Sequence, residues 1–236
     1  MRKKEFHIKT YWDETLQLYI KEAIPESEKH LQEIVDIHNI VSQDFKESTN
    51  IDIVKTIYIS KNKVWFEPAL WNSLMDMVNN QKITTTQALE KVVYILNQLK
   101  QEDSWNKTDR QRLFGKFGWC IYNSNNYVTW ILDITMSNIL RDKPANMYTL
   151  IDQERYSKSC IPRKLLVFRA INVMKWRWAI KSCDYIHICK NIWIKRWQIP
   201  IMLHQENNFQ YYVSWWKKPN IITFLQDIYK IYAKKF

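Results

Sequence analysis

Apolar residues recur at three- and four-residue spacing along most of the first 150 positions, which is typical of amphipathic helices. Pro25 begins the clearest of these stretches, and Glu26 and Glu28 follow where acids complement a helix dipole. The spacing predicts helices at 11–23, 25–46, 68–78, 84–99, 108–115 and 127–141.

One interval within this region has a different period. Ile51, Ile53, Ile57 and Ile59 all lie at odd positions, which predicts a strand, and a polar turn at 60–63 separates them from an apolar run at 64–66. The sequence therefore predicts a short β-hairpin near 51–66.

The last third of the chain combines both periods. Pro162 precedes a helical pattern at 163–171, but from Met174 onward apolar and basic residues alternate. The alternation predicts three antiparallel strands at about 173–180, 185–196 and 209–216. Pro219 then begins a final helix whose apolar stripe would cover one face of this sheet.

The expected fold class is accordingly α+β. A mainly helical first part with one hairpin precedes a small antiparallel sheet near 173–216, which is basic and aromatic and is covered by a C-terminal helix. We expect two domains, a neutral scaffold or partner-binding part at 1–150 and a basic, tryptophan-rich α+β part at 151–236.

Composition excludes several classes of protein. With 46% apolar residues the chain can bury a core, so it is not disordered, and only 4 cysteines in 236 residues exclude a small disulfide scaffold. The 2 glycines are too few for a Rossmann or P-loop phosphate cradle. No stretch approaches the roughly 20 apolar residues of a transmembrane helix. Acids soon after the basic start argue against a targeting peptide, and we expect an intracellular protein that is not secreted.

The net charge of +11 has a definite location. Residues 1–150 contain 19 Lys+Arg and 19 Asp+Glu, whereas 151–236 contain 16 and 5. Half of the 12 tryptophans lie between Arg155 and Lys218. An excess of positive charge that is confined to one aromatic-rich part is typical of a surface that contacts a polyanion.

Two kinds of side chain could bind nucleic acid on such a surface. Lysine and arginine release counterions from phosphates, and exposed rings stack on unpaired bases. The candidate phosphate contacts are Arg163, Lys164, Arg169, Lys175, Arg177, Lys181, Lys190, Lys195, Arg196, Lys217 and Lys218. The candidate stacking groups are Trp193, Trp197, Tyr212 and Trp216. The alternative is that the tryptophans are core residues and the lysines a solvated face.

Metal binding and catalysis have weaker support. Cys160, Cys183, His187 and Cys189 are a nominal zinc set, but their spacing lacks the close ligand pairs of structural zinc sites, and buried free thiols are the simpler interpretation. No catalytic motif occurs, and neither a third group beside His204 and Glu206 nor a cofactor site can be nominated.

The sequence therefore favours a non-enzymatic protein that binds RNA or another single-stranded nucleic acid, without a cofactor. No motif identifies a family, although small basic tryptophan-rich chains of this composition occur among viral accessory proteins and ribonucleoprotein subunits. The first alternative is a protein–protein adaptor or assembly subunit whose basic patch meets an acidic partner. The second is a DNA-binding replication or transcription factor.

Overall fold

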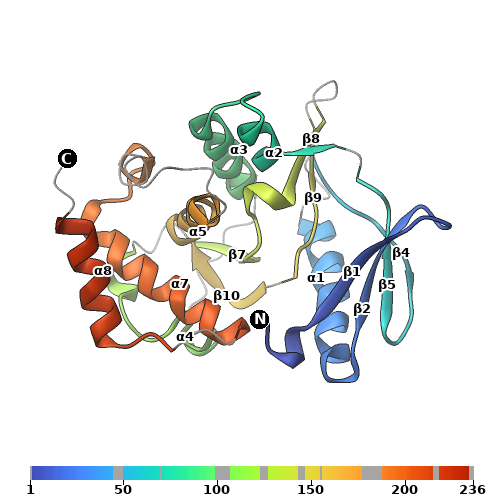
Figure 1. Cartoon of the computed structure of the whole chain (residues 1–236), viewed down its shortest axis with the longest axis horizontal. Coiled ribbons are helices and arrows are strands. Elements are labelled where there is room, and N and C mark those ends of the chain that lie inside the picture. Colours follow the sequence, from blue (N-terminus) through green and yellow to red (C-terminus); the bar gives the residue numbers. More distant parts are fainter. Residues whose placement is uncertain are drawn as a thin grey trace. The chain divides into compact units, whose positions relative to one another are not determined.

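The computed structural model describes residues 2–44, 50–69, 71–98, 107–122, 127–142, 147–154, 156–176, 188–214 and 218–233 (Figure 1). The chain forms two compact units, each built from two separate stretches of sequence. Residues 2–100 and 131–156 form the first, here called the strand-rich unit, and residues 101–130 and 157–236 form the second, the helical unit. Residues 101–130 therefore belong with the basic end of the chain.

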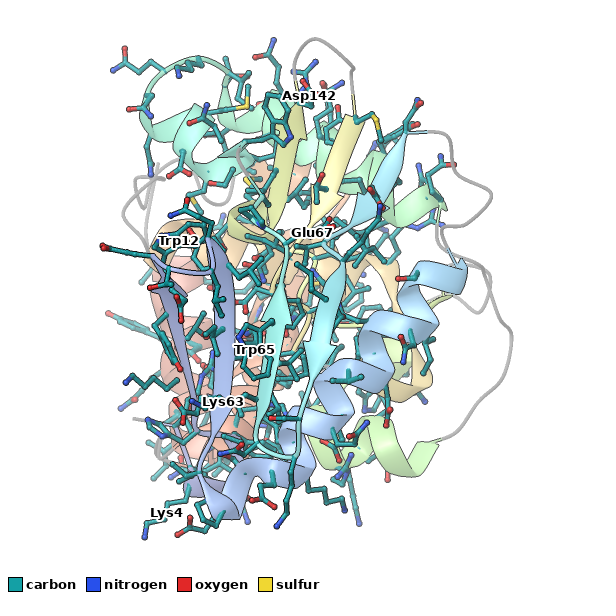
Figure 2. All side chains as sticks on the ribbon, turned by 90° about the vertical axis from the view of Figure 1, so that its right-hand side faces the viewer. Lys4, Trp12, Lys63, Trp65, Glu67 and Asp142 are labelled. Atoms are coloured by element: carbon teal, nitrogen blue, oxygen red, sulfur yellow. The ribbon has the colours of Figure 1, made fainter. Side chains whose placement is uncertain are left out.

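The strand-rich unit begins with an antiparallel sheet of order β1-β2-β5-β4. Its strands are β1 (Ile8–Asp13), β2 (Leu18–Ala23), β5 (Lys63–Phe66) and β4 (Thr56–Ile59). Figure 2 shows Lys63 and Trp65 along β5 and Glu67 beyond its end. Helix α1 (Glu28–Asp44) packs on this sheet and buries Leu31, Ile34 and Val35 against Val64 and Phe66.

A second sheet in the same unit has the order β3-β9-β8-β6. Its strands are β3 (Ile51–Ile53), β9 (Met147–Leu150), β8 (Ile139–Asp142) and β6 (Asn72–Ser73). β3 runs parallel to β9, whereas β8 pairs antiparallel with β9 and with β6. Helices α2 (Leu74–Asn79) and α3 (Thr85–Gln98) complete the unit, and the Ser73 hydroxyl caps α2 by accepting the Asp76 backbone N–H at 3.0 Å.

The helical unit is built around α7 (Ile199–Val213). Helix α4 (Lys107–Phe114) packs on it through the stacked rings of Phe114 and Phe209, whose centroids are 5.4 Å apart. Helix α8 (Ile221–Ala233) packs against α7 (Figure 1). Two further helices, α5 (Arg163–Trp176) and the 3-10 helix η6 (Arg196–Gln198), and a two-stranded sheet of β10 (Tyr156–Pro162) and β7 (Tyr127–Ile131) also belong to this unit.

Several sequence-based predictions are confirmed. The fold class is α+β with an antiparallel sheet and a C-terminal helix, and β4 and β5 form the hairpin expected near 51–66. The helices expected at 25–46, 84–99 and 163–171 correspond to α1, α3 and α5. In the described ranges, no helix is long and apolar enough to cross a membrane.

The sheet predicted near 173–216 is wrong in its location. Residues 173–176 continue α5, and 209–213 are the last turns of α7. Phe209 and Val213 satisfy an alternating pattern, but they are also four residues apart and are both buried on one helix face. The described residues 188–196 contain no strand, and 177–187 and 215–217 lie outside the described part.

Two helices predicted in the first part are also wrong. Residues 11–23 form most of the β1–β2 hairpin, where the Asp13 carboxylate accepts the backbone N–H groups of Thr15 and Leu16 at 3.0 and 2.9 Å and so closes the turn. Residues 127–141 contain β7, a 3-10 turn and most of β8. Both segments carry β-branched or aromatic residues that pair well in a sheet, and tertiary pairing overrides their helical spacing.

Candidate functional site

A lysine is buried within the strand-rich unit. The β2 residues Ile20 and Lys21 are both buried, although successive side chains of a strand point to opposite faces, so β2 is covered on both faces here. The Lys21 side chain is 6% exposed. Its Nζ donates to the Asp152 carboxylate and to Glu154 Oε1, the latter at 2.5 Å. Burial alone would lower the pKa of Lys21, but the two carboxylates together raise it, and the ammonium stays charged.

Glu154 is shared between two cations. Its Oε2 accepts a hydrogen bond from an Arg2 Nη at 2.5 Å, and its Oε1 accepts the one from Lys21. Burial lowers the pKa of Arg2, but the negative charges of Glu154, Asp133 and Asp152 outweigh that effect and raise it. The three acids therefore lie close enough to Arg2 to act on its charge. We call the following residues the Lys21 cluster: Arg2, Lys21, Asp133, Asn138, Asp152 and Glu154.

The loop before β8 and the segment after β9 are tied together by Asn138. Because Ile139 pairs with Leu150, the residues just outside this antiparallel pair meet at one end of the sheet. The Asn138 side-chain amide donates to the backbone carbonyls of Asp133 and Asp152, at 3.1 and 3.4 Å. The backbone carbonyl of Asn138 accepts the Ile151 backbone N–H at 2.9 Å.

Asp152 stands out within the cluster in two ways. It has a φ of 57°, in the left-handed region that residues other than glycine seldom adopt. Its side chain is 44% exposed, whereas those of Lys21 and Glu154 are almost completely covered. The cluster therefore presents one carboxylate to solvent beside a buried ammonium, and the chain holds that carboxylate in an uncommon backbone conformation.

His38 of α1 lies beside this cluster. Its ring is buried against Phe66, with the two ring centroids 5.0 Å apart. Burial, and then the positive charge of Lys21, lower the pKa of His38 to about 4. The imidazole is therefore neutral at pH 7 and adds no second charge next to the lysine.

The helical unit contains a separate pocket with a volume of about 320 Å³. Two lysines, one aromatic ring and several neutral groups line it: Lys164, Lys195, Trp197, Gln198, Cys120, Ile121, Tyr122 and Pro162. Lys164 belongs to the first turn of α5, and Lys195 and Trp197 belong to the segment that leads into α7. We call this site the basic pocket.

The structure brings together only part of the nucleic-acid surface predicted from the sequence. Lys164, Lys195 and Trp197 line the basic pocket. Lys190, Lys218 and Trp193 are exposed, with Trp193 at 82%, whereas Arg163 and Arg196 are partly buried. Lys175 lies on α5, where only its backbone is described, and Arg177, Lys181, Trp216 and Lys217 lie outside the described residues.

Two of the predicted contacts are engaged with other residues of the protein. The buried Arg169 donates to Glu206 Oε2 at 2.6 Å and lies over the Phe209 ring, so its charge is already paired within the helical unit. The Tyr212 hydroxyl accepts a hydrogen bond from Arg112 at 2.8 Å, and the guanidinium lies over the Tyr212 ring. Arg112 therefore covers the ring that was expected to stack on a base.

The zinc candidates do not come together in the described ranges. Cys189 is a buried free thiol, Cys160 lies on β10 with only its backbone described, and Cys183 and His187 are outside the described residues. Within the part of the chain that the structure describes, no three His, Cys, Asp or Glu side chains form a metal-binding group.

Sequence reasoning missed the Lys21 cluster because its members lie in or next to the neutral part of the chain. Two signals were available. Asp133 and Asn138 flank four residues just before a strand, and Asp152 lies two residues after the end of the next strand. Polar residues at the ends of paired strands meet in space, but only the β8–β9 pairing reveals that these do.

Comparison with known proteins gives little further guidance. No protein-family model and no curated protein sequence matches the chain. Among solved structures, the chain is similar to a Plasmodium vivax ethanolamine kinase, with 11% sequence identity and a TM-score of 0.36 over 97% of this chain and 75% of that one. A likeness of this strength assigns neither a family nor an activity to the chain.

Proposed function

We propose that the strand-rich unit is a metal-assisted phosphotransferase, which moves a phosphoryl group from a nucleoside triphosphate to a hydroxyl acceptor. The single observation that carries the proposal is the Lys21 cluster, in which a strand lysine contacts Asp152 and Asn138 ties Asp152 to Asp133. This proposal differs from the non-enzymatic function expected from the sequence.

Phosphoryl transfer of the kinase type requires this set of side chains. A strand lysine binds phosphate oxygens, and an aspartate accepts the proton of the attacking hydroxyl. An asparagine five residues after that aspartate and a second aspartate after a later strand hold Mg²⁺. Asp133 and Asn138 have this spacing, Asp152 follows β9, and Lys21 lies on β2.

The roles follow from burial and hydrogen bonding. Lys21 would bind a donor phosphate, because it is charged and its partner Asp152 is partly open to solvent. Asp133 would accept the acceptor's proton, and the Asn138 amide, by donating to its backbone carbonyl, fixes the loop that carries it.

Asp152 and Asn138 would hold the metal. Mg²⁺ is usually bound by one or two carboxylates together with substrate phosphates, so the half-exposed Asp152 carboxylate, on a residue whose backbone carbonyl the Asn138 amide contacts, fits it without a three-acid cage. When bound, the ion would neutralise charge on the transferring phosphoryl group.

The cluster departs from the usual kinase arrangement at two points. The β1–β2 turn contains no glycine, so its backbone does not supply a glycine-rich phosphate loop, and donor binding must rely more on side chains. Lys21 pairs with Glu154, two residues beyond Asp152, instead of with a helix glutamate, while α1 places the neutral His38 near the lysine.

The test is calorimetric titration of the full chain with ATP, with and without Mg²⁺, followed by measurement of γ-phosphate release. We expect Mg²⁺-dependent binding. Asp133→Asn should keep ATP binding within about threefold and lower turnover by about 100-fold or more. Asp152→Asn should lose the Mg²⁺-dependent part of the binding.

Asp142→Asn is the matched control, because Asp142 is a carboxylate of the same unit at the other end of β8 from Asn138 (Figure 2). It should change binding and turnover by less than twofold, and circular dichroism should show that each variant is folded. Absence of Mg²⁺-dependent ATP binding to the wild-type chain, or equal binding by wild type and Asp152→Asn, would overturn the proposal.

A further inference from the structure

We propose that the basic pocket of the helical unit holds one nucleotide of a single-stranded nucleic acid, with its phosphates on Lys164 and Lys195 and its base on Trp197. This site is independent of the proposed phosphoryl transfer, because every residue that lines it lies in the helical unit.

Two cations are free to bind phosphate in this pocket. Lys164 and Lys195 come from segments about thirty residues apart and converge on one cavity. Within the described ranges, neither lysine forms an ion pair with a carboxylate. The buried Arg169 of the same unit differs, since Glu206 already neutralises its charge. The pocket therefore keeps positive charge that a bound phosphate can neutralise.

The pocket also offers an aromatic surface. Trp197 is 47% exposed and lines the cavity, so a planar ring can reach its indole without displacing the core. Stacking on such a ring requires an unpaired base, since a duplex keeps the faces of its bases covered. This favours a single strand over duplex DNA.

The wall that carries Lys195 and Trp197 is fixed before any ligand binds. Gln198 is buried, its Oε1 accepts the Lys195 backbone N–H at 2.9 Å, and its Nε2 donates to the Ile121 carbonyl at 3.3 Å. These two bonds join the lysine segment to the opposite wall, so little ordering entropy is lost on binding. A volume of about 320 Å³ lies at the small end of the range for ligand sites, which suits one nucleotide.

Neighbouring residues allow the strand to continue beyond the pocket. Trp193 and Lys190 are exposed a few positions before Lys195, and they provide a second ring and a third cation. Nothing in this set reads base edges, because lysines contact phosphates and indoles stack on every base. We therefore expect binding that depends on the length of the nucleic acid and on salt, but little on its base sequence.

The experiment is fluorescence anisotropy of a labelled 12-nucleotide RNA, titrated with the full chain at several salt concentrations and without ATP or Mg²⁺. The Lys164→Ala/Lys195→Ala double variant should bind about tenfold more weakly at 0.1 M salt. Its slope of log affinity against log salt should be smaller by about 1.4, or about 0.7 for each lost phosphate contact. Trp197→Leu should weaken binding at least fivefold and leave the slope unchanged.

The control is Lys116→Ala/Lys218→Ala, which removes the same charge from exposed lysines of the same unit outside the pocket. If this control lowers affinity as much as the pocket variant, the pocket assignment is overturned. Equal affinity for a free nucleoside monophosphate and for the 12-mer would overturn the proposal of a nucleic-acid ligand and would indicate a small phosphorylated ligand. Binding to anionic vesicles that depends on the two pocket lysines, without RNA binding, would overturn the proposed nucleic-acid ligand and would indicate a lipid surface.

Discussion

Lys21 and Glu154 form an ion pair across 133 residues of sequence, with Nζ and Oε1 2.5 Å apart and each side chain only 6% exposed. A buried pair of this kind is costly to assemble, because both charges leave water, and even more costly to leave half complete. The pair therefore connects the first sheet to the segment after β9, and it also holds the ammonium of the proposed phosphotransferase site.

Loss of Lys21 should destabilise the fold as well as the site. We expect Lys21→Met to lower the free energy of unfolding by about 3–5 kcal/mol, because the buried Glu154 then loses the buried ammonium with which it pairs. Urea denaturation of the full chain measures this. Lys63→Met removes a lysine of the adjacent strand that pairs with Glu22 at the surface, and it should have a far smaller effect. Similar losses in both variants would contradict the structural role of the buried Lys21–Glu154 pair.

Stability should fall in acid partly because of His38. Its pKa is about 4 in the folded chain and about 6.5 when unfolded, so between these values the unfolded chain binds more protons. The stabilising effect of the neutral ring is complete above pH 6.5 and is lost as the pH falls to 4. His38→Leu should remove about 3 kcal/mol of the difference in unfolding free energy between pH 7 and pH 4. Parallel pH profiles for the variant and the wild type would exclude this role.

The two glycines should differ in their tolerance of a side chain. Both have left-handed φ values, 79° at Gly115 and 82° at Gly118. A Cβ at Gly118 would lie 2.0 Å from Ile201 Cγ2, whereas at Gly115 it would meet only the end of the Asn208 side chain, at 3.0 Å. We expect Gly118→Ala to cost about 3 kcal/mol and Gly115→Ala about 1 kcal/mol. Thermal unfolding checks the order, and adding Ile201→Ala to Gly118→Ala should recover part of the loss.

Arg169 should affect stability and leave nucleic-acid binding unchanged. Arg169→Met leaves Glu206 buried with Gln210 as its remaining hydrogen-bond partner, and we expect a loss of about 3–5 kcal/mol. The double variant Arg169→Met/Glu206→Leu removes both charges and should recover most of that loss. The salt dependence of RNA binding should be the same in the folded double variant as in the wild type. A smaller slope would mean that Arg169 contacts phosphate after all.

Local patterns predicted those elements whose apolar spacing and end signals agree. Helix α1 begins just after Pro25 and buries Leu31 and Ile34 at helical spacing, as expected. Helix α8 follows Pro219 in the same way. Helix α7 was missed because its aromatic residues also alternate. Pro200, in its first turn, was the available signal for a helix start.

The two candidate sites also differ in how far the sequence could predict them. Lysines and a tryptophan of the basic pocket could be named from composition, because the excess of charge is local in the sequence. The Lys21 cluster could not, since β2, the loop before β8 and the segment after β9 meet only through the pairing of strands. Exposure was not predictable either: Lys164 and Arg169 are basic residues of the same helix, but Arg169 lies on a buried face and Lys164 does not.

The parallel pairing of β3 with β9 has a consequence for synthesis of the chain. Ile51 pairs with Tyr148, so β3 leaves the ribosome roughly a hundred residues before β9, its one partner strand among the described residues, exists. Its apolar Ile51 and Ile53, which are buried in the finished protein, have no sheet to join during that interval. All of α4, which belongs to the other unit, is translated in the meantime. The nascent chain should therefore depend on chaperone protection of this edge strand until β9 emerges.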